Sequence, residues 1–181
     1  VKHGIVLTES RQLFFEKTLN NFKIILNLIG AVDVFDFLGH IDISFYQGWD
    51  NNKTFLEILE DNLDNDKRRK TTLLGPHKAD IKFFINDIDA KQILSRGEQK
   101  FFSILWSCAQ NEVLKNEYNI DPLLIIDDVK SELDERVFNL LLEILSNSKN
   151  QIIFSCIDNV FSSKMADRLN QFKMFHVEQL R

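Results

Sequence analysis

A short apolar run that ends in two adjacent acids constrains the fold of this chain more than any other feature. The run extends from Leu123 to Ile126, is preceded by Pro122, and is followed directly by Asp127 and Asp128. A run of this length, bounded by proline and acids, is typical of a fully buried strand rather than a helix. Strands of that kind occur in parallel sheets that are covered on both faces. The run therefore predicts an α/β protein.

The two acids lie where an α/β protein usually places its functional groups. Ligands of open parallel sheets bind beyond the carboxyl ends of the strands. Two adjacent carboxylates at that edge can hold a hydrated Mg²⁺ and polarise a water, which is the Walker B arrangement of nucleoside triphosphatases. The alternative is that Asp127 and Asp128 are two solvated acids at the start of a loop.

The segments on either side of the acid pair predict a strand–helix–strand unit. An amphipathic helix is expected after a capping pair formed by Ser131 and Asp134, and residues 151–157 form a second short apolar strand. This unit is the crossover that joins two parallel strands. Upstream, the apolar spacing predicts a long helix from Ser95 to about Tyr118.

The rest of the chain predicts helices joined by short strands. The expected elements are a helix over 9–29, a strand over 41–46, a helix over 53–66, two extended pieces separated by Gly75-Pro76 within 71–85, a turn at Asn86-Asp87 with a return over 88–93, a helix over 161–169 and a last strand over 172–178. The second extended piece alternates apolar and other residues and is the one expected to be a strand.

Composition and charge exclude several classes of protein. The 181 residues are 44% apolar and 27% charged, which suffices for one large domain with a substantial core. A net charge of -5 argues against a wholly basic nucleic-acid binder. The basic cluster at 67–70 is either a phosphate contact or a solvated helix end. Cys108 and Cys156 are expected to be reduced, buried thiols of a cytoplasmic protein, and no apolar run approaches membrane-spanning length.

The stretch Ser95-Arg96-Gly97-Glu98-Gln99 has two interpretations. Ser95 with Glu98 three residues later is a capping box. The same helix start presents free backbone N–H groups beside a glycine, and these suit a phosphate. The stretch alone does not decide between a cap and an anion site. Because one helix, a buried strand and the acid pair follow it in order, the anion site is favoured.

These motifs, in this order, resemble those of a known family. LSRGEQ at 94–99 resembles the signature motif of ABC-type ATPase heads, LLIIDD at 123–128 their Walker B strand, and SELDE at 131–135 their D-loop. Together with GPHKAD, ISFYQGW and KMFHVEQ, they resemble the RecF family of bacterial recombination and replication-repair ATPases. The resemblance covers residues from about 41 to 181.

The resemblance implies an α/β fold that is the C-terminal half of an ABC-type (P-loop NTPase) ATPase head with part of a helical arm or lobe. Residues 1–70 would be the arm segment with a short strand, and 71–181 the head. The sequence begins with Val and contains no GxxxxGK[ST] Walker A loop. We therefore expect a piece of a longer protein that binds ATP weakly or not at all by itself.

The resemblance also implies roles for the acids. Asp127 would hold Mg²⁺ through water, and Asp128 would be the general base or would position the attacking water. Lys130 follows closely, where it could face solvent or tune the acids. Many ABC-type heads carry a histidine after the next strand, whereas this chain has Ser155 and Cys156 there, so a γ-phosphate sensor of the usual kind is not expected.

The signature and D-loop residues would act across an ATP-dependent homodimer. Ser95 and Gly97 would touch the γ-phosphate of ATP held by a second subunit, and Ser131 and Asp134 would lie at the dimer contact. The nucleotide-binding set implied by the resemblance is Ser95, Arg96, Gly97, Glu98, Gln99, Ser131 and Asp134.

The implied function is slow, regulatory ATP hydrolysis by a protein that binds DNA at single-strand/double-strand junctions. Such a protein would help to load recombinase at gapped DNA, with the RecO and RecR proteins as partners. One alternative is another SMC-like head, but the long heptad arms of that class are not visible here. The other is a non-enzymatic interaction module that retains the fold.

Overall fold

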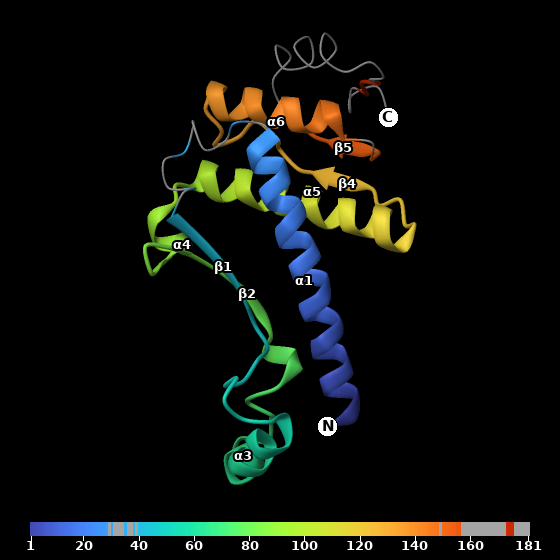
Figure 1. The fold of residues 1–181 in the computed structure, drawn as a ribbon. Helices are drawn as coiled ribbons and strands as arrows, with labels where there is room; N and C mark the ends of the chain where they lie inside the picture. The colour runs from blue at the N-terminus through green and yellow to red at the C-terminus, as the bar shows by residue number, and fades with distance from the viewer. Residues whose placement is uncertain are drawn as a thin grey trace.

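The computed structural model describes residues 1–28, 30, 35, 38, 40–148, 150–156 and 173–175. The elements are α1 (Lys2–Leu28), β1 (Ile41–Tyr46), α3 (Phe55–Arg69), η2 (Pro76–Lys78), β2 (Asp80–Ile85), β3 (Ile88–Asp89), α4 (Ala90–Ile93), α5 (Arg96–Tyr118), β4 (Leu124–Ile126), α6 (Glu135–Asn147) and β5 (Ile152–Phe154). β1, β2 and β3 form an antiparallel sheet, and β4 pairs with β5 in parallel. Figure 1 shows α1 running across α5, with α3 and α6 at opposite ends.

The core is built where α1 packs against α5. Phe15 and Phe22 of α1 lie with their ring centroids 6.1 and 5.3 Å from that of Trp106. Phe22 is fully buried and also contacts Phe102, at 5.9 Å. Burying a side chain of this size stabilises a fold by roughly 1.5–3 kcal/mol. The phenylalanines spaced along α1 therefore anchor this helix on α5.

The antiparallel sheet adds one face to the same core. Phe45 of β1, paired with Ile81 of β2, contacts Phe15 at a centroid distance of 5.9 Å. Phe83 meets Trp106 edge-on at 5.4 Å. Strand residues two apart share a face, so Ile81 and Phe83 both point to the helices. β1 belongs to the predicted arm segment (1–70) and β2 to the predicted head (71–181), so their pairing joins the two segments in one sheet. The division at residue 70 stays a prediction.

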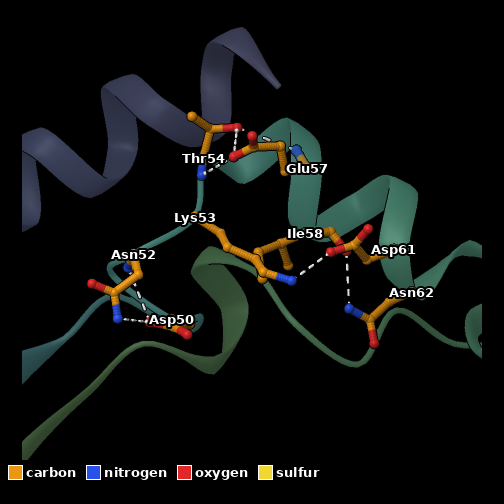
Figure 2. Close-up of polar contacts among 8 residues, drawn as sticks. All are labelled: Asp50, Asn52, Lys53, Thr54, Glu57, Ile58, Asp61 and Asn62. Atoms are coloured by element: carbon orange, nitrogen blue, oxygen red, sulfur yellow. Dashed lines mark hydrogen bonds and ion pairs between the residues drawn. The ribbon is translucent and has the colours of Figure 1, made fainter.

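The start of α3 is fixed by a capping box, which Figure 2 shows. The Thr54 hydroxyl accepts from the Glu57 N–H at 3.3 Å, and the Glu57 carboxylate accepts from the Thr54 N–H at 2.7 Å. Because Thr54 donates to this carboxylate from its backbone and its hydroxyl, the pKa of Glu57 is lowered. Lys53 donates to Asp61 at 2.7 Å, and this contact raises the pKa of Lys53.

The segment around α3 is held to the rest by contacts from the flanking loops. Trp49 is buried and stacks on Phe55 with ring centroids 4.7 Å apart. The Arg11 guanidinium of α1 donates to the carbonyl of Pro76 at 2.5 Å. The 3₁₀ turn η2 is therefore held to α1, and α1 itself lies close to the Phe55 ring of α3.

The structure confirms most of the predicted elements and moves several of their boundaries. α1 begins at Lys2 instead of residue 9, and α3 ends at Arg69 instead of residue 66. Of the two extended pieces around Gly75-Pro76, only the second is a strand. The predicted return over 88–93 is a strand for two residues and then a short helix.

The last predicted elements fall largely beyond what the structure describes. The expected helix over 161–169 lies outside the described residues, and the expected strand over 172–178 is described only at 173–175. Among the residues described, no helix has the length and apolar character needed to cross a membrane.

Candidate functional site

β4 carries the two acids to the carboxyl end of a parallel strand pair, as predicted, but the expectation of a fully buried strand is wrong because Ile125 is 68% exposed. Leu124 and Ile126 are buried, and they pair with Ile152 and Phe154 of β5. Asp127 follows at once and is exposed, and the residue after it is half-buried. The two carboxyl groups therefore reach the molecular surface at the strand end, where a ligand can approach them.

Ser155, the residue after β5, fixes the acids in place. Its hydroxyl donates to Oδ1 of Asp127 at 2.5 Å and accepts from the N–H of Asp128 at 2.8 Å. Its backbone N–H donates to the Ile126 carbonyl, and its carbonyl accepts from the Val129 N–H, both at 3.0 Å. In the sequence, Ser155 stands out only as a position without histidine. The signal that could have revealed its role is a small hydroxyl residue at the end of the neighbouring strand.

The turn that follows β4 has an uncommon backbone. Asp128 has a φ of 46° and Glu132 a φ of 68°, in the left-handed region that few non-glycine residues adopt. Within the turn, the Ser131 N–H donates to the Asp128 carbonyl at 3.1 Å. Aspartate tolerates this region better than most residues because its short side chain can bond locally. The neighbouring segments therefore have to hold this turn in shape.

The signature stretch forms the capping box at the start of α5. The Ser95 hydroxyl donates to Glu98 Oε2 at 2.7 Å and accepts from the Glu98 N–H at 3.3 Å, while the Ser95 N–H donates to the same carboxylate at 2.7 Å. The Gln99 amide donates to the Leu94 carbonyl at 2.9 Å. Glu98 and Gln99 therefore stabilise their own turn. For the Ser95 hydroxyl to donate to a phosphate, its hydrogen bond to the Glu98 carboxylate would have to break.

The first turn of α5 lies against the turn after β4 in the same chain. Gly97 approaches so closely that a Cβ placed on it would lie 2.2 Å from the carbonyl oxygen of Glu132. The guanidinium of Arg96 lies 3.6 Å from the Glu132 carboxylate. Glycine is required at this position because any side chain would collide with backbone. The structure thus brings Arg96 and Gly97 against the turn after β4 of their own chain.

Lys100 joins these two turns and was missed in the sequence. Its Nζ donates to the carbonyl of Asp128 at 2.5 Å, to the carbonyl of Ser131 at 3.2 Å and to the hydroxyl of Ser131 at 2.9 Å. Its position four residues after Arg96 places both side chains on one face of the helix. The sequence shows that spacing, but it does not show which distant residues pack against this face of the helix.

The predicted capping pair of Ser131 and Asp134 is wrong in one member. Asp134 is the N-cap of α6, and its carboxylate accepts from the Val137 N–H at 2.8 Å. Ser131 lies earlier in the turn and accepts from Lys100 instead. The cap preference for aspartate is as strong as that for serine, and the helix begins three residues later than a Ser131 cap would require.

A metal ion fits this site only with help from other ligands. Among the described residues, no group of three or more His, Cys, Asp and Glu side chains is placed to hold a metal. Carboxylate oxygen is the donor that Mg²⁺ prefers, and Mg²⁺ commonly keeps several waters and binds substrate phosphates besides one or two carboxylates. Asp127, exposed at the strand end, suits that kind of shared coordination.

Comparison with known proteins identifies clear relatives. No protein-family model matches the chain. The DNA replication and repair protein RecF of Shewanella baltica is 32% identical over 185 residues, covering 100% of this chain and 48% of the relative. The protein of the same name from Shewanella frigidimarina is 35% identical over 166 residues, covering 88% of this chain and 45% of the relative. The chain spans about half the length of the curated relatives it matches.

Solved structures share the fold. One is the recombination mediator protein RecF-ATP in the RecFOR pathway, with a TM-score of 0.63 and 22% identity over 87% of this chain and 43% of that chain. The corresponding RecF-ATPrS structure has a TM-score of 0.60 and 21% identity over 86% and 42%. The fold is thus α/β, as predicted, and it matches a little over two fifths of each of these RecF structures.

Proposed function

The chain belongs to the RecF family, and we propose that it supplies the hydrolytic acids and the signature motif of an ATP-dependent DNA-repair protein. One observation carries the proposal. Asp127 and Asp128 emerge at the carboxyl end of β4, and the first turn of α5 packs against the turn that holds them. In this proposal, the contact joins the acids, which serve the chain's own nucleotide, to the signature turn, which serves the nucleotide of a second copy.

In this proposal, the acids divide the work. Asp127 holds Mg²⁺ through water, and the ion neutralises charge on the phosphates when it is bound. Asp128 orients the attacking water or accepts its proton. The Ser155 hydroxyl, which donates to Asp127 and accepts from the Asp128 N–H, keeps Asp127 and the backbone of Asp128 in a fixed arrangement. A fixed arrangement lowers the barrier because the reacting groups are already oriented.

The signature residues act on nucleotide held by a second copy. Ser95 and Arg96 are exposed at the start of α5, where the partial positive charge of a helix N-terminus favours phosphate. Gly97 lets this turn approach other backbone closely, and Glu98 and Gln99 shape it. Ser131 and Asp134, on the adjoining turn, would lie at the dimer contact. Together with the signature residues, they complete the proposed nucleotide-binding set.

At the level of the whole protein, we propose the role that the family names suggest. The protein would bind DNA at single-strand/double-strand junctions in the cytoplasm, form a homodimer on ATP, and help to load recombinase at gapped DNA. RecO and RecR would be its partners, because one solved relative is described as the mediator of the RecFOR pathway. Support for this level comes from the family, and support for the chemistry comes from the site.

The test compares variants of the full-length protein with and without MgATP by sedimentation and phosphate release. Ser95→Arg should abolish ATP-dependent dimerisation, and Asp128→Asn should abolish phosphate release. Asp121→Asn is the matched control, since Asp121 lies before β4 rather than after it and pairs with Lys115. If nucleotide changes neither assembly nor hydrolysis in the unmodified protein, a non-enzymatic interaction module is the better description.

A further inference from the structure

We propose that Lys100 is a positioning residue that clamps the turn after β4 to the start of α5, so that Asp128 and the signature motif of one chain move as one unit. The mechanistic meaning of this clamp rests on the proposed function. The clamp itself is a structural statement about contacts within the chain, and it can be tested without nucleotide.

Each N–H donor of the Lys100 ammonium group has an acceptor in the turn after β4. An ammonium group has three N–H donors, and it accepts no hydrogen bonds. Nζ lies 2.5 Å from the Asp128 carbonyl, 3.2 Å from the Ser131 carbonyl and 2.9 Å from the Ser131 hydroxyl. All three acceptors belong to one turn. Hydrogen bonds from a charged donor are roughly twice as strong as neutral ones, so the side chain holds this turn firmly.

Lys100 completes the restraint on the backbone of Asp128. The N–H of Asp128 donates to the Ser155 hydroxyl at 2.8 Å, and its carbonyl accepts from Lys100 at 2.5 Å. The peptide groups on both sides of Asp128 are therefore fixed. Because its φ of 46° is uncommon for aspartate, the conformation depends on these restraints. Fixing both peptides also fixes the direction in which the carboxylate leaves the backbone.

A second contact shows that the two turns form a single packed unit. Gly97 lies against the Glu132 carbonyl with no room for a side chain, and the Arg96 guanidinium lies 3.6 Å from the Glu132 carboxylate. Lys100 is one helical turn further along the same face of α5. A displacement of the α5 start by a ligand would therefore be passed to the turn that carries Asp128. In a dimer, this would link contact with the second copy's nucleotide to hydrolysis at the chain's own site.

The first experiment measures hydrogen–deuterium exchange of the turn in Lys100→Met, which removes the charge and keeps most of the apolar stem. The Ser131 N–H bonds the Asp128 carbonyl, and the Leu133 N–H bonds the Lys130 carbonyl. We expect both amides to exchange about tenfold faster in the variant, because the turn opens locally. Lys100→Arg should restore most of the protection.

The matched control is Lys115→Met on the same helix. Lys115, like Lys100, is half-buried, and it donates to Asp121 at 2.7 Å, at the far end of α5. The Lys115→Met variant should leave hydrogen–deuterium exchange in the turn after β4 unchanged. If Lys100→Met also leaves it unchanged, the clamp is refuted. Should Lys100→Met fail to fold, Lys100→Gln keeps a neutral donor and is expected to show an intermediate increase; the absence of any increase would equally refute the clamp.

The second experiment measures ATP hydrolysis by the same variants of the full-length protein. Lys100→Met should lower kcat by roughly 10- to 100-fold and leave KM for ATP unchanged, because Lys100 positions Asp128 and does not contact nucleotide. Faster exchange with unchanged kcat would overturn the link to hydrolysis. If the unmodified protein does not hydrolyse ATP while Lys100→Met still exchanges faster, the clamp stands and the proposed function fails.

Discussion

At the scale of single residues, the hydroxyl of Ser155 has two partners that matter to the site. Ser155→Ala removes the donor to Asp127 and the acceptor for the Asp128 N–H. We expect the free energy of unfolding to fall by about 0.5–1.5 kcal/mol, as for a typical hydrogen-bonding group. Urea unfolding of the variant measures this loss. Ser155→Thr keeps the hydroxyl, so its free energy of unfolding should fall less. Equal falls in both variants would show that packing, not hydrogen bonding, causes the loss of stability.

A second prediction at this scale concerns Cys108. Its side chain is buried in the core, and burial raises the pKa of the thiol to about 12. Because the thiolate is the nucleophile, Cys108 should resist iodoacetamide at about pH 8 in the folded protein and react after unfolding in urea. Peptide mass spectrometry measures the modification, and equal labelling in both states would contradict the prediction.

The same shift predicts how Cys108 affects stability with pH. Its pKa is higher in the folded state than the ordinary value of 9.0, so the unfolded chain releases the proton first as pH rises. The contribution of this group to the free energy of unfolding is therefore constant below about pH 9 and declines between pH 9 and 12.

Single residues also show where sequence analysis succeeds and where it stops. The Ser95–Glu98 box and the acid pair were predictable because their partners lie within a few positions. Lys100 and Ser155 were not, since each acts on a turn 28 or 27 positions away. Their partners are determined by the packing of α5 and β5 around the turn, which no local pattern contains.

At the scale of elements, the contact between α5 and the turn after β4 predicts the effect of Gly97→Ala. Alanine favours a helix over glycine by about 1 kcal/mol. Here its methyl would lie 2.2 Å from the Glu132 carbonyl oxygen, so the elements must separate. Overpacking of this kind costs about 1–3 kcal/mol, and we expect a net loss of stability by thermal unfolding.

The control for this variant is Ser103→Ala, an exposed position on the same helix. It should be neutral or slightly stabilising, because it gains helix propensity without meeting another element. A Gly97→Ala protein as stable as Ser103→Ala would show that the two turns separate without cost, and would contradict the packed arrangement.

Element boundaries were harder to predict than elements. α1 starts seven residues earlier than the periodicity indicated (2 against 9) because tertiary contacts support its first turns. A Cβ on Gly4 would lie 2.6 Å from the Phe55 ring, and the Thr8 hydroxyl donates back to the Gly4 carbonyl at 2.9 Å. Packing against α3 thus extends a helix whose start lacks the usual cap residues.

At the scale of the whole molecule, the sequence predicts weak nucleotide binding by this chain alone. It contains the acids and the signature motif but no GxxxxGK[ST] loop, whose backbone N–H groups and lysine grip the phosphates. Titration calorimetry of the 181-residue chain with MgATP should therefore show no micromolar binding. The full-length protein is the positive control, and micromolar affinity in the isolated chain would contradict the prediction.

The α/β fold class could be predicted from the order of a few sequence motifs. The arrangement of the antiparallel sheet could not. The parallel pair of β4 and β5 was predictable because one helix joins consecutive strands. β1 pairs with β2 across α3 and its loops, which is a contact between distant segments. Such pairings depend on the whole core, so the position of the α3 segment could not be inferred from the sequence.

The two tryptophans described above make the chain a reporter of its own unfolding. Trp106 lies among the phenylalanines of α1 and β2, whereas Trp49, in the loop after β1, stacks on Phe55 of α3. Replacing either tryptophan with phenylalanine leaves one fluorescent tryptophan, either beside α3 or in the core against α1. Comparing the thermal unfolding curves of the two single-tryptophan proteins then shows whether α3 and the α1–α5 core unfold together or one after the other.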